Sequence, residues 1–172
     1  MGKKMKLTYV NGDATKPVGK GKKLVLHIAN DENLWNSGFV LAVNQLSPRP
    51  VDEYHRWYNE FPKYGPMETG PFKLGQAQFI HVEQNIIVVN MIAQSTPGGY
   101  NGFPPIRYQS LEECLMRVRE KVVAYQKRGG VVSLHGPRFG SERAGGSWPE
   151  IEKIINRVFK DVDVDFTIYD FK

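Results

Sequence analysis

Short apolar runs alternate with amphipathic helical patterns along almost the whole chain. The runs are rich in β-branched residues and several are bounded by Gly or Asn, which is typical of strands. Strands are expected at Lys6–Val10, Leu24–Ala29, Ala77–Val82, Ile86–Ile92, Val131–His135 and Val164–Tyr169. The run IIVVNMI is apolar on both faces, which indicates a central strand. Strands interleaved with helices predict an α/β protein in which helices cover both faces of one sheet.

Four helices are expected between these strands. Apolar residues follow the helical period from Ser110 to Arg128 and again in a helix that begins at Ser147. Each start has the Ser-x-x-Glu spacing of a capping box. Two shorter helices are expected at Phe39–Leu46 and Asp52–Phe61, separated by the sequence SPRP.

The length of 172 residues, with 41% hydrophobic and 24% charged residues, predicts one globular domain spanning residues 1–172. No apolar run approaches the ~18 residues that a membrane span requires, and the start of the chain has no apolar segment typical of a signal peptide. The single cysteine, Cys114, excludes an internal disulfide. A cytoplasmic location is therefore expected. The protein is also expected to be a monomer.

The net charge of +5 is concentrated near the start of the chain. Residues 1–23 contain seven lysines and one acidic residue, Asp13, whereas the rest of the chain is close to neutral. A basic flank of this kind attracts polyanions by long-range electrostatics. Nucleic-acid binding is one interpretation, and a solvated basic arm is the other.

Two glycine- or Asx-rich loops lie between an expected strand and an expected helix. The segment GPRFGSERAGGSW, residues 136–148, contains four glycines, which allow the backbone to approach a ligand closely. The segment HIANDENLWNSGFVLAV, residues 27–43, places several polar side chains directly after an apolar run. Ligands of α/β sheets bind where such loops leave the carboxyl ends of strands, and free N–H groups there bind anions. A third loop, VNGDAT, places Asp13 after the first strand, where a carboxylate can accept from an exocyclic amine.

The common nucleotide and metal motifs are absent. There is no GxxxxGK[ST], no GxGxxG after the first strand and no GxSxG. The four histidines have no partners at zinc-ligand spacing, and His27 and His135 lie in apolar strands, where hydrogen-bonded core histidines are expected. The sequence therefore predicts no metal and no cofactor.

Taken together and in this order, the loops resemble the macro domain family. The motifs that carry the resemblance are GDAT, HIANDENLWNSGFV, VVNMIAQ, PRFGSERAGGSW and the terminal TIYDF, which span about residues 6–171. The pattern is most similar to the branch that contains Appr-1″-p processing proteins and terminal ADP-ribose protein glycohydrolases. This resemblance implies a three-layer α/β/α fold with a central mixed, mostly parallel sheet of about six strands. It also implies that ADP-ribose or an ADP-ribosylated molecule is the ligand.

The resemblance further implies roles for individual residues. The adenine would lie beside Asp13, the diphosphate between the two loops, and the distal ribose beside Asn30 and Asp31. The candidate catalytic residues are Asn30, Asp31 and Glu142. The candidate ligand-binding residues are Asp13, Ala14, Asn36, Ser37, Gly38, Phe39, Val40, Gln94, Arg138, Gly140, Ser141, Arg143, Ala144, Gly145, Tyr169 and Phe171.

Two departures from the related glycohydrolases affect the chemistry. Gln94 stands where those enzymes have a lysine, and Ala144 stands where they have an aspartate. A carboxamide cannot form a covalent adduct with a sugar as an amine does. The leading interpretation is a hydrolase that acts on an ADP-ribose derivative at its distal ribose, through an activated water. The alternative is a module that binds ADP-ribose without turnover.

Overall fold

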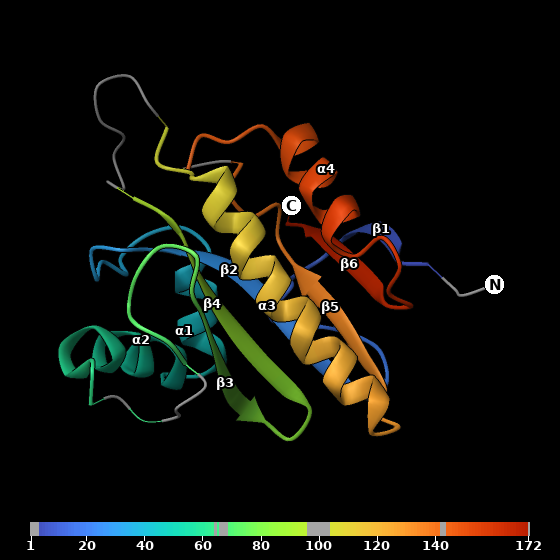
Figure 1. The fold of residues 1–172 in the computed structure, drawn as a ribbon, viewed down its shortest axis with the longest axis horizontal. Helices are drawn as coiled ribbons and strands as arrows, with labels where there is room; N and C mark the ends of the chain where they lie inside the picture. The colour runs from blue at the N-terminus through green and yellow to red at the C-terminus, as the bar shows by residue number, and fades with distance from the viewer. Residues whose placement is uncertain (1–3, 64, 66–68, 96–103, 142–143, 172) are drawn as a thin grey trace.

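The computed structural model describes residues 4–63, 65, 69–95, 104–141 and 144–171, and these residues form one six-stranded sheet and four helices (Figure 1). The strands are β1 (Lys6–Asn11), β2 (Lys22–Asn30), β3 (Ala77–Glu83), β4 (Ile86–Gln94), β5 (Val132–Gly136) and β6 (Asp165–Asp170). The helices are α1 (Val40–Leu46), α2 (Arg49–Glu60), α3 (Tyr108–Lys127) and α4 (Trp148–Val158).

The sheet is mixed and mostly parallel, as expected. Its strand order is β1-β6-β5-β2-β4-β3, and only the pairing of β3 with β4 is antiparallel among the described strands. The carboxyl ends of the parallel strands therefore lie at one edge of the sheet. This edge carries both loops that the sequence singles out.

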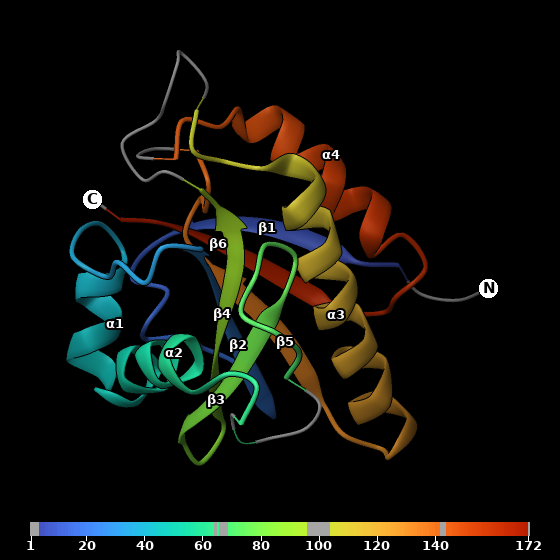
Figure 2. The same ribbon diagram turned by 60° about the vertical axis from the view of Figure 1, so that its left-hand side comes forward.

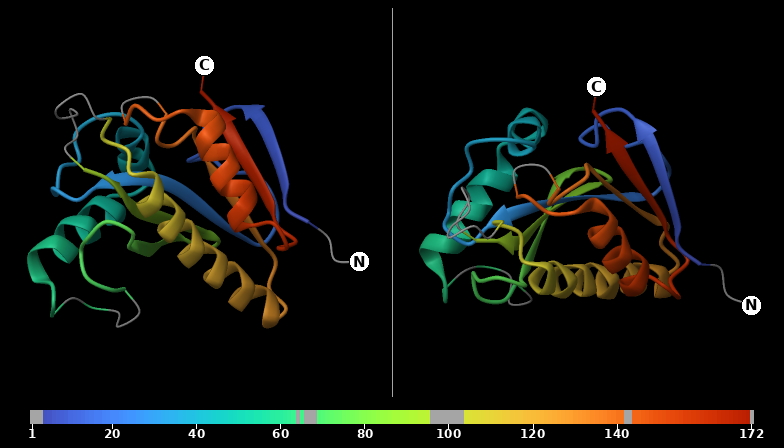
Figure 3. Two further views of the ribbon diagram at one scale, coloured as in Figure 1. Left: turned by 45° about the horizontal axis from the view of Figure 1, so that its top comes forward. Right: turned by 90° about the horizontal axis from the view of Figure 1, so that it is seen from above.

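Helices cover both faces of the sheet, with α1 and α2 on one side and α3 and α4 on the other (Figures 2 and 3). The strand period of two explains this division, because successive side chains point to opposite faces. Leu24 and Leu26 of β2 join the core beneath α3 and α4, whereas Val25 packs against Val43 of α1. Within the described residues, no helix is both long and apolar enough to span a membrane.

The expected helix starts are partly wrong. Helix α2 begins at Arg49, because Pro50 fits the first helical turn, where N–H groups have no intrahelical acceptor. Helix α3 begins after Arg107, so Ser110 lies inside it and forms no cap. Ser147 is the N-cap of α4 as expected, but its side chain makes no capping bond, and its N–H donates to the Tyr108 hydroxyl at 2.8 Å.

Four of the described lysines near the start of the chain lie at two places. Lys6 begins β1 and Lys22 and Lys23 begin β2, at the amino edge of the sheet, opposite the two loops. Lys16 follows β1 in the β1–β2 connection. Binding of a polyanion to these residues stays a prediction.

Two strand histidines are buried, as expected for core residues, each with only 1% of its surface exposed. His27 Nε2 lies 2.5 Å from Asn90 Oδ1, and His135 lies 2.7 Å from Ser133 Oγ and 2.8 Å from Tyr169 Oη. Burial lowers the pKa of His27 to about 4, and burial together with Lys23 lowers that of His135 to about 4.

These two histidines predict an acid-sensitive fold. Between pH 6.5 and pH 4 the unfolded chain binds protons at both side chains while the folded chain does not, so the free energy of unfolding should fall with falling pH. The expected loss is on the order of 3 kcal/mol per histidine. Urea denaturation at pH 7, 5.5 and 4.5 measures it. His135→Gln cannot titrate and should show a shallower pH dependence; an unchanged slope would contradict the assignment.

Candidate functional site

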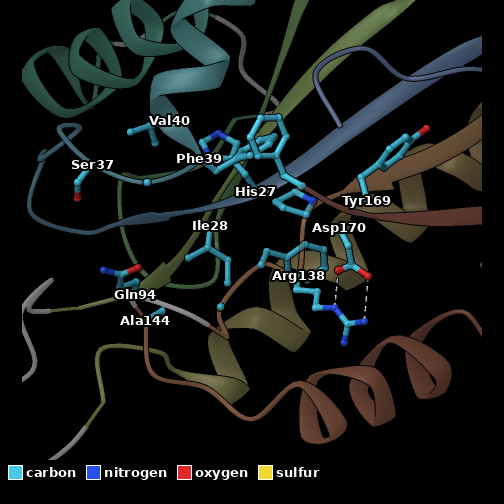
Figure 4. A pocket seen from close by; sticks show the side chains of 15 residues that line it. His27, Ile28, Ser37, Phe39, Val40, Gln94, Arg138, Ala144, Tyr169 and Asp170 are labelled. Atoms are coloured by element: carbon cyan, nitrogen blue, oxygen red, sulfur yellow. Dashed lines mark hydrogen bonds and ion pairs between the residues drawn. The ribbon is translucent and has the colours of Figure 1, made fainter. Parts of the chain in front are cut away.

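A cavity of about 640 Å³ opens at the carboxyl edge of the sheet (Figure 4). Its walls come from the end of β2, the β2–α1 loop, the end of β4, the β5–α4 loop and the end of β6. The expected ligand-binding residues that line it are Ser37, Gly38, Phe39, Val40, Gln94, Arg138, Gly140, Ala144, Tyr169 and Phe171. The two loops predicted to meet in space therefore do so.

The β5–α4 loop folds back on itself beside the cavity. The Gly146 N–H donates to Gly140 O at 2.8 Å, and the Ala144 carbonyl accepts from the Ile106 N–H at 3.0 Å. Gly140 has φ +81°, and a Cβ there would lie 2.9 Å from the Cδ1 atoms of Ile28 and Ile106. The positive φ favours glycine, and an added Cβ would force these two methyl groups to shift.

The β2–α1 loop is held by side-chain hydrogen bonds. Asn30 bonds to the backbone of Glu32 and Leu34. Asn33, which has φ +64°, places its Oδ1 atom 2.6 Å from His55 Nδ1 of α2. Trp35 Nε1 donates to Asn44 Oδ1 at 2.8 Å. These bonds fix the loop in the structure without a ligand.

Backbone N–H groups on both loops are left without an internal acceptor. Across the described ranges, the N–H groups of Gly38, Phe39 and Val40 and those of Gly140 and Ala144 make no hydrogen bond. All five residues line the cavity. Unpaired N–H groups on converging loops form an anion site.

One end of the cavity is formed by Gln94 and Ala144 (Figure 4). A bulge brings Asn30 into register with Gln94 instead of Ala93, and the Asp31 N–H donates to Gln94 O at 3.0 Å. The Asp31 Oδ2 atom accepts from Ser95 Oγ at 3.3 Å, and Oδ1 is buried without a partner among the residues the structure describes. Asn30 and Asp31 therefore lie next to this end, although neither lines the cavity itself.

The other end contains aromatic side chains from the end of β6. Tyr169 and Phe171 both line the cavity, as their shared face predicts. Tyr169 is buried, and its hydroxyl accepts from the Val18 N–H at 3.3 Å, whereas Phe171 is 81% exposed at the rim. One fixed ring and one solvent-facing ring thus flank this end.

Arg138 lines the cavity but is engaged elsewhere. Its Nε and Nη2 atoms lie 2.6 and 3.1 Å from the Asp170 carboxylate oxygens, and its guanidinium lies 4.9 Å from the centre of the Tyr9 ring. The hydrogen bond to Asp170 raises the pKa of Arg138, and this outweighs the lowering effect of burial. Its charge is therefore already balanced at the cavity rim.

Several expected ligand-binding residues lie away from this cavity. Asp13 lines a second hollow of about 620 Å³ beside α1, and its Oδ1 atom accepts from both the N–H and the hydroxyl of Thr15. Ala14 is buried. Ser141 donates its hydroxyl to Arg138 O, and like Asn36 and Gly145 it does not line the cavity. Glu142 and Arg143 lie outside the described residues.

The sequence reasoning missed five wall residues: His27, Ile28, Pro137, Phe139 and Asp170. His27 was expected to be a core residue, which it is, but its ring also lies in the cavity wall. The position of Asp170 in the cavity wall could have been inferred from the sequence, because Asp170 lies directly between Tyr169 and Phe171, which were both expected to bind the ligand. No group of three His, Cys, Asp or Glu side chains suited to a metal ion occurs within the part of the chain that the structure describes.

The comparisons agree with this geometry. No model of a known protein family and no curated protein matches the chain. Among solved structures, a Bacteroides thetaiotaomicron protein described as of unknown function has 36% identity and a TM-score of 0.85, covering 96% of this chain and 98% of its own. A macrodomain protein from Streptomyces coelicolor has 34% identity and a TM-score of 0.77, covering 96% of this chain and 99% of its own.

The chain belongs to the macrodomain family. A more distant structure, Thermosipho africanus DarTG in complex with ADP-ribose, has 15% identity and a TM-score of 0.68 over 97% of this chain and 42% of its own. At 15% identity, this similarity shows that the two proteins share a fold. The macrodomain fold expected from the sequence is thus confirmed.

Gly140 provides a test of the loop geometry of this macrodomain. Gly140→Ala should destabilise the fold and weaken ligand binding, because it adds a clash with Ile28 and Ile106 to the strain of a positive φ. The expected total is about 2–4 kcal/mol in unfolding free energy. Gly129→Ala is the matched control, since Gly129 has φ +80° and open space around its Cβ position. Equal losses in the two variants, measured by urea denaturation, would contradict the close packing of the loop.

Proposed function

We propose that this macrodomain binds ADP-ribose in the cavity and hydrolyses a derivative of it at the distal ribose. One observation carries the proposal: two separate loops present unpaired N–H groups to a single cavity. Such groups suit a diphosphate, which accepts several hydrogen bonds at once. The volume of about 640 Å³ lies in the range of small-molecule sites.

The two ends of the cavity suit the two ends of ADP-ribose. The adenine would lie beside Tyr169 and Phe171, where a stacked aromatic contributes about 1–3 kcal/mol by analogy with base stacking. The distal ribose would then lie beside Gln94, next to Asn30 and Asp31. The DarTG structure with ADP-ribose, which shares the fold, supports this choice of ligand. Asp13 would contact adenine only if the nucleotide reached the second hollow.

Asp31 is the best-placed group to activate water. Its Oδ1 atom has no partner among the described residues, and Asp31 lies next to the end of the cavity proposed for the distal ribose. In the step we propose, Asp31 accepts a proton from water as the water oxygen attacks, and the proton then passes to the leaving atom. Hydrolysis of an ester, a glycosidic link or a 1″-phosphate in this way releases free ADP-ribose in each case. Glu142 stays a second candidate for this role.

One observation favours binding without turnover. Gln94 and Ala144, at the end of the cavity beside Asp31, are neutral and supply no nucleophile. A module that only recognises ADP-ribose needs the same diphosphate loops and no acid or base. The two functions differ in whether the protein hydrolyses its ligand, and therefore in whether replacement of Asp31 slows a reaction.

Binding itself is tested by calorimetry with free ADP-ribose. The protein should bind ADP-ribose with a favourable enthalpy, because fixed N–H groups exchange water for phosphate oxygens. Phe171→Ala should weaken binding about fivefold or more through lost stacking at the rim. Absence of any heat with the wild-type protein would end the proposal.

The enzymatic claim is tested with Asp31→Asn. If Asp31 is the general base, hydrolysis of O-acetyl-ADP-ribose, ADP-ribose-1″-phosphate or an ADP-ribosylated acceptor should slow about 10²–10⁴-fold, with ADP-ribose affinity nearly retained. Glu32→Gln, which neutralises the exposed neighbouring carboxylate, should leave the rate unchanged. Wild-type protein that releases no product from any of these substrates would leave the binding module as the function.

A further inference from the structure

An ion pair lies in the wall of the cavity, between Arg138 of the β5–α4 loop and Asp170 at the end of β6 (Figure 4). The Arg138 Nε and Nη2 atoms donate to the two carboxylate oxygens of Asp170 at 2.6 and 3.1 Å. Two parallel bonds of this kind fix the relative orientation of both groups as well as their distance. The pair therefore joins the loop that carries Gly140 to the strand end that carries Tyr169 and Phe171.

Two aromatic rings also hold the guanidinium of Arg138. It lies 4.9 Å from the centre of the Tyr9 ring and 5.7 Å from that of the Trp148 ring. Trp148 Nε1 donates to the Tyr9 hydroxyl at 2.8 Å, and this hydroxyl donates to Glu152. A turn of the guanidinium toward a phosphate would break the bidentate bond and the ring contacts. These contacts hold the cation beside Asp170.

Asp170 is a carboxylate in the wall of a cavity proposed for an anion. Its side chain is partly exposed and lines the cavity. A diphosphate is anionic at neutral pH, so an unpaired carboxylate at this position would oppose its binding. Arg138 is the one cationic residue in the wall among the residues that the structure describes. It is therefore the group in the wall that can cancel the charge of Asp170.

We propose that Arg138 is a positioning residue that acts as the counter-ion of Asp170 and does not itself bind the diphosphate. The inference rests on the proposed function and names the electrostatic condition under which the same cavity accepts an anion. With the pair intact, the wall is close to neutral and backbone N–H groups recognise the ligand. Without the cation, Asp170 repels the ligand; without the carboxylate, Arg138 is released to attract it.

The test is a double-mutant cycle in which ADP-ribose is titrated by calorimetry at low and at high salt. Arg138→Gln should weaken binding about fivefold, and added salt should recover part of the loss, because salt screens the repulsion by Asp170. Asp170→Asn should strengthen binding about threefold at low salt, and added salt should remove the gain. When both substitutions are combined, most of the affinity lost in Arg138→Gln should return, because neither charge remains.

Lys153→Gln is the matched control, because it removes a cation from an exposed ion pair with Glu150 on α4. It should change neither the affinity for ADP-ribose nor the salt dependence of that affinity. Arg138→Met removes the charge but keeps an unbranched side chain against the aromatic rings. It repeats the cycle if Arg138→Gln folds poorly.

Two results would overturn the inference and leave the proposed function intact. A double variant that binds as weakly as Arg138→Gln would show that Arg138 contacts the ligand directly. Losses in both single variants that salt does not alter would show that the pair only supports the fold. Wild-type protein that does not bind ADP-ribose at all would overturn the inference and the proposed function together.

Discussion

Backbone N–H groups without an internal acceptor are the constraint on which this macrodomain site depends. A buried N–H without a partner costs about 1–3 kcal/mol, so N–H groups that have no acceptor in the protein occur where water or a ligand can accept. Here they occur on two loops, around Phe39 and around Gly140, that face one cavity. The parallel sheet makes this possible, because it brings the carboxyl ends of β2, β4 and β5 to the same edge.

The charges around the cavity support recognition by dipoles. Arg138 is the one cationic residue that lines the cavity among the described residues, and Asp170 already balances its charge. A diphosphate would therefore be bound through oriented N–H groups, which fix its geometry as well as its charge. Binding through oriented N–H groups requires loops whose backbone is held in place. The Gly140 turn and the hydrogen bonds of Asn30, Asn33 and Trp35 provide that rigidity.

Most of the fold could be predicted from the sequence, but the finer details of the site could not. Apolar runs with a period of two or 3.6 fixed each strand and helix to within a few residues, since burial of these faces dominates. The capping box expected at Ser110 is wrong, because Tyr108 and Gln109 extend the start of α3 by two residues. This extension is a tertiary preference, which local sequence spacing does not reveal. Asp13 and Asn30 were assigned to the ligand from their positions at strand ends and from the family pattern. Their hydrogen bonds to Thr15 and to Leu34 depend on loop conformations that only coordinates show.

Helix α2 connects these observations, although it lies outside the cavity. Its Tyr54 hydroxyl bonds to Asn30, and its Pro50 carbonyl accepts from the Asn90 amide, whose oxygen lies 2.5 Å from His27 Nε2. Because Asn90 Nδ2 also donates to Gln78, the Asn90 oxygen must accept, and His27 therefore carries its proton on Nε2. One helix thus sets the donor and acceptor pattern at His27 in the cavity wall and at Asn30 next to the cavity. Because Asp170 balances Arg138, the one cationic residue that lines the cavity among the described residues, such fixed polarity helps to distinguish one sugar or phosphate geometry from another.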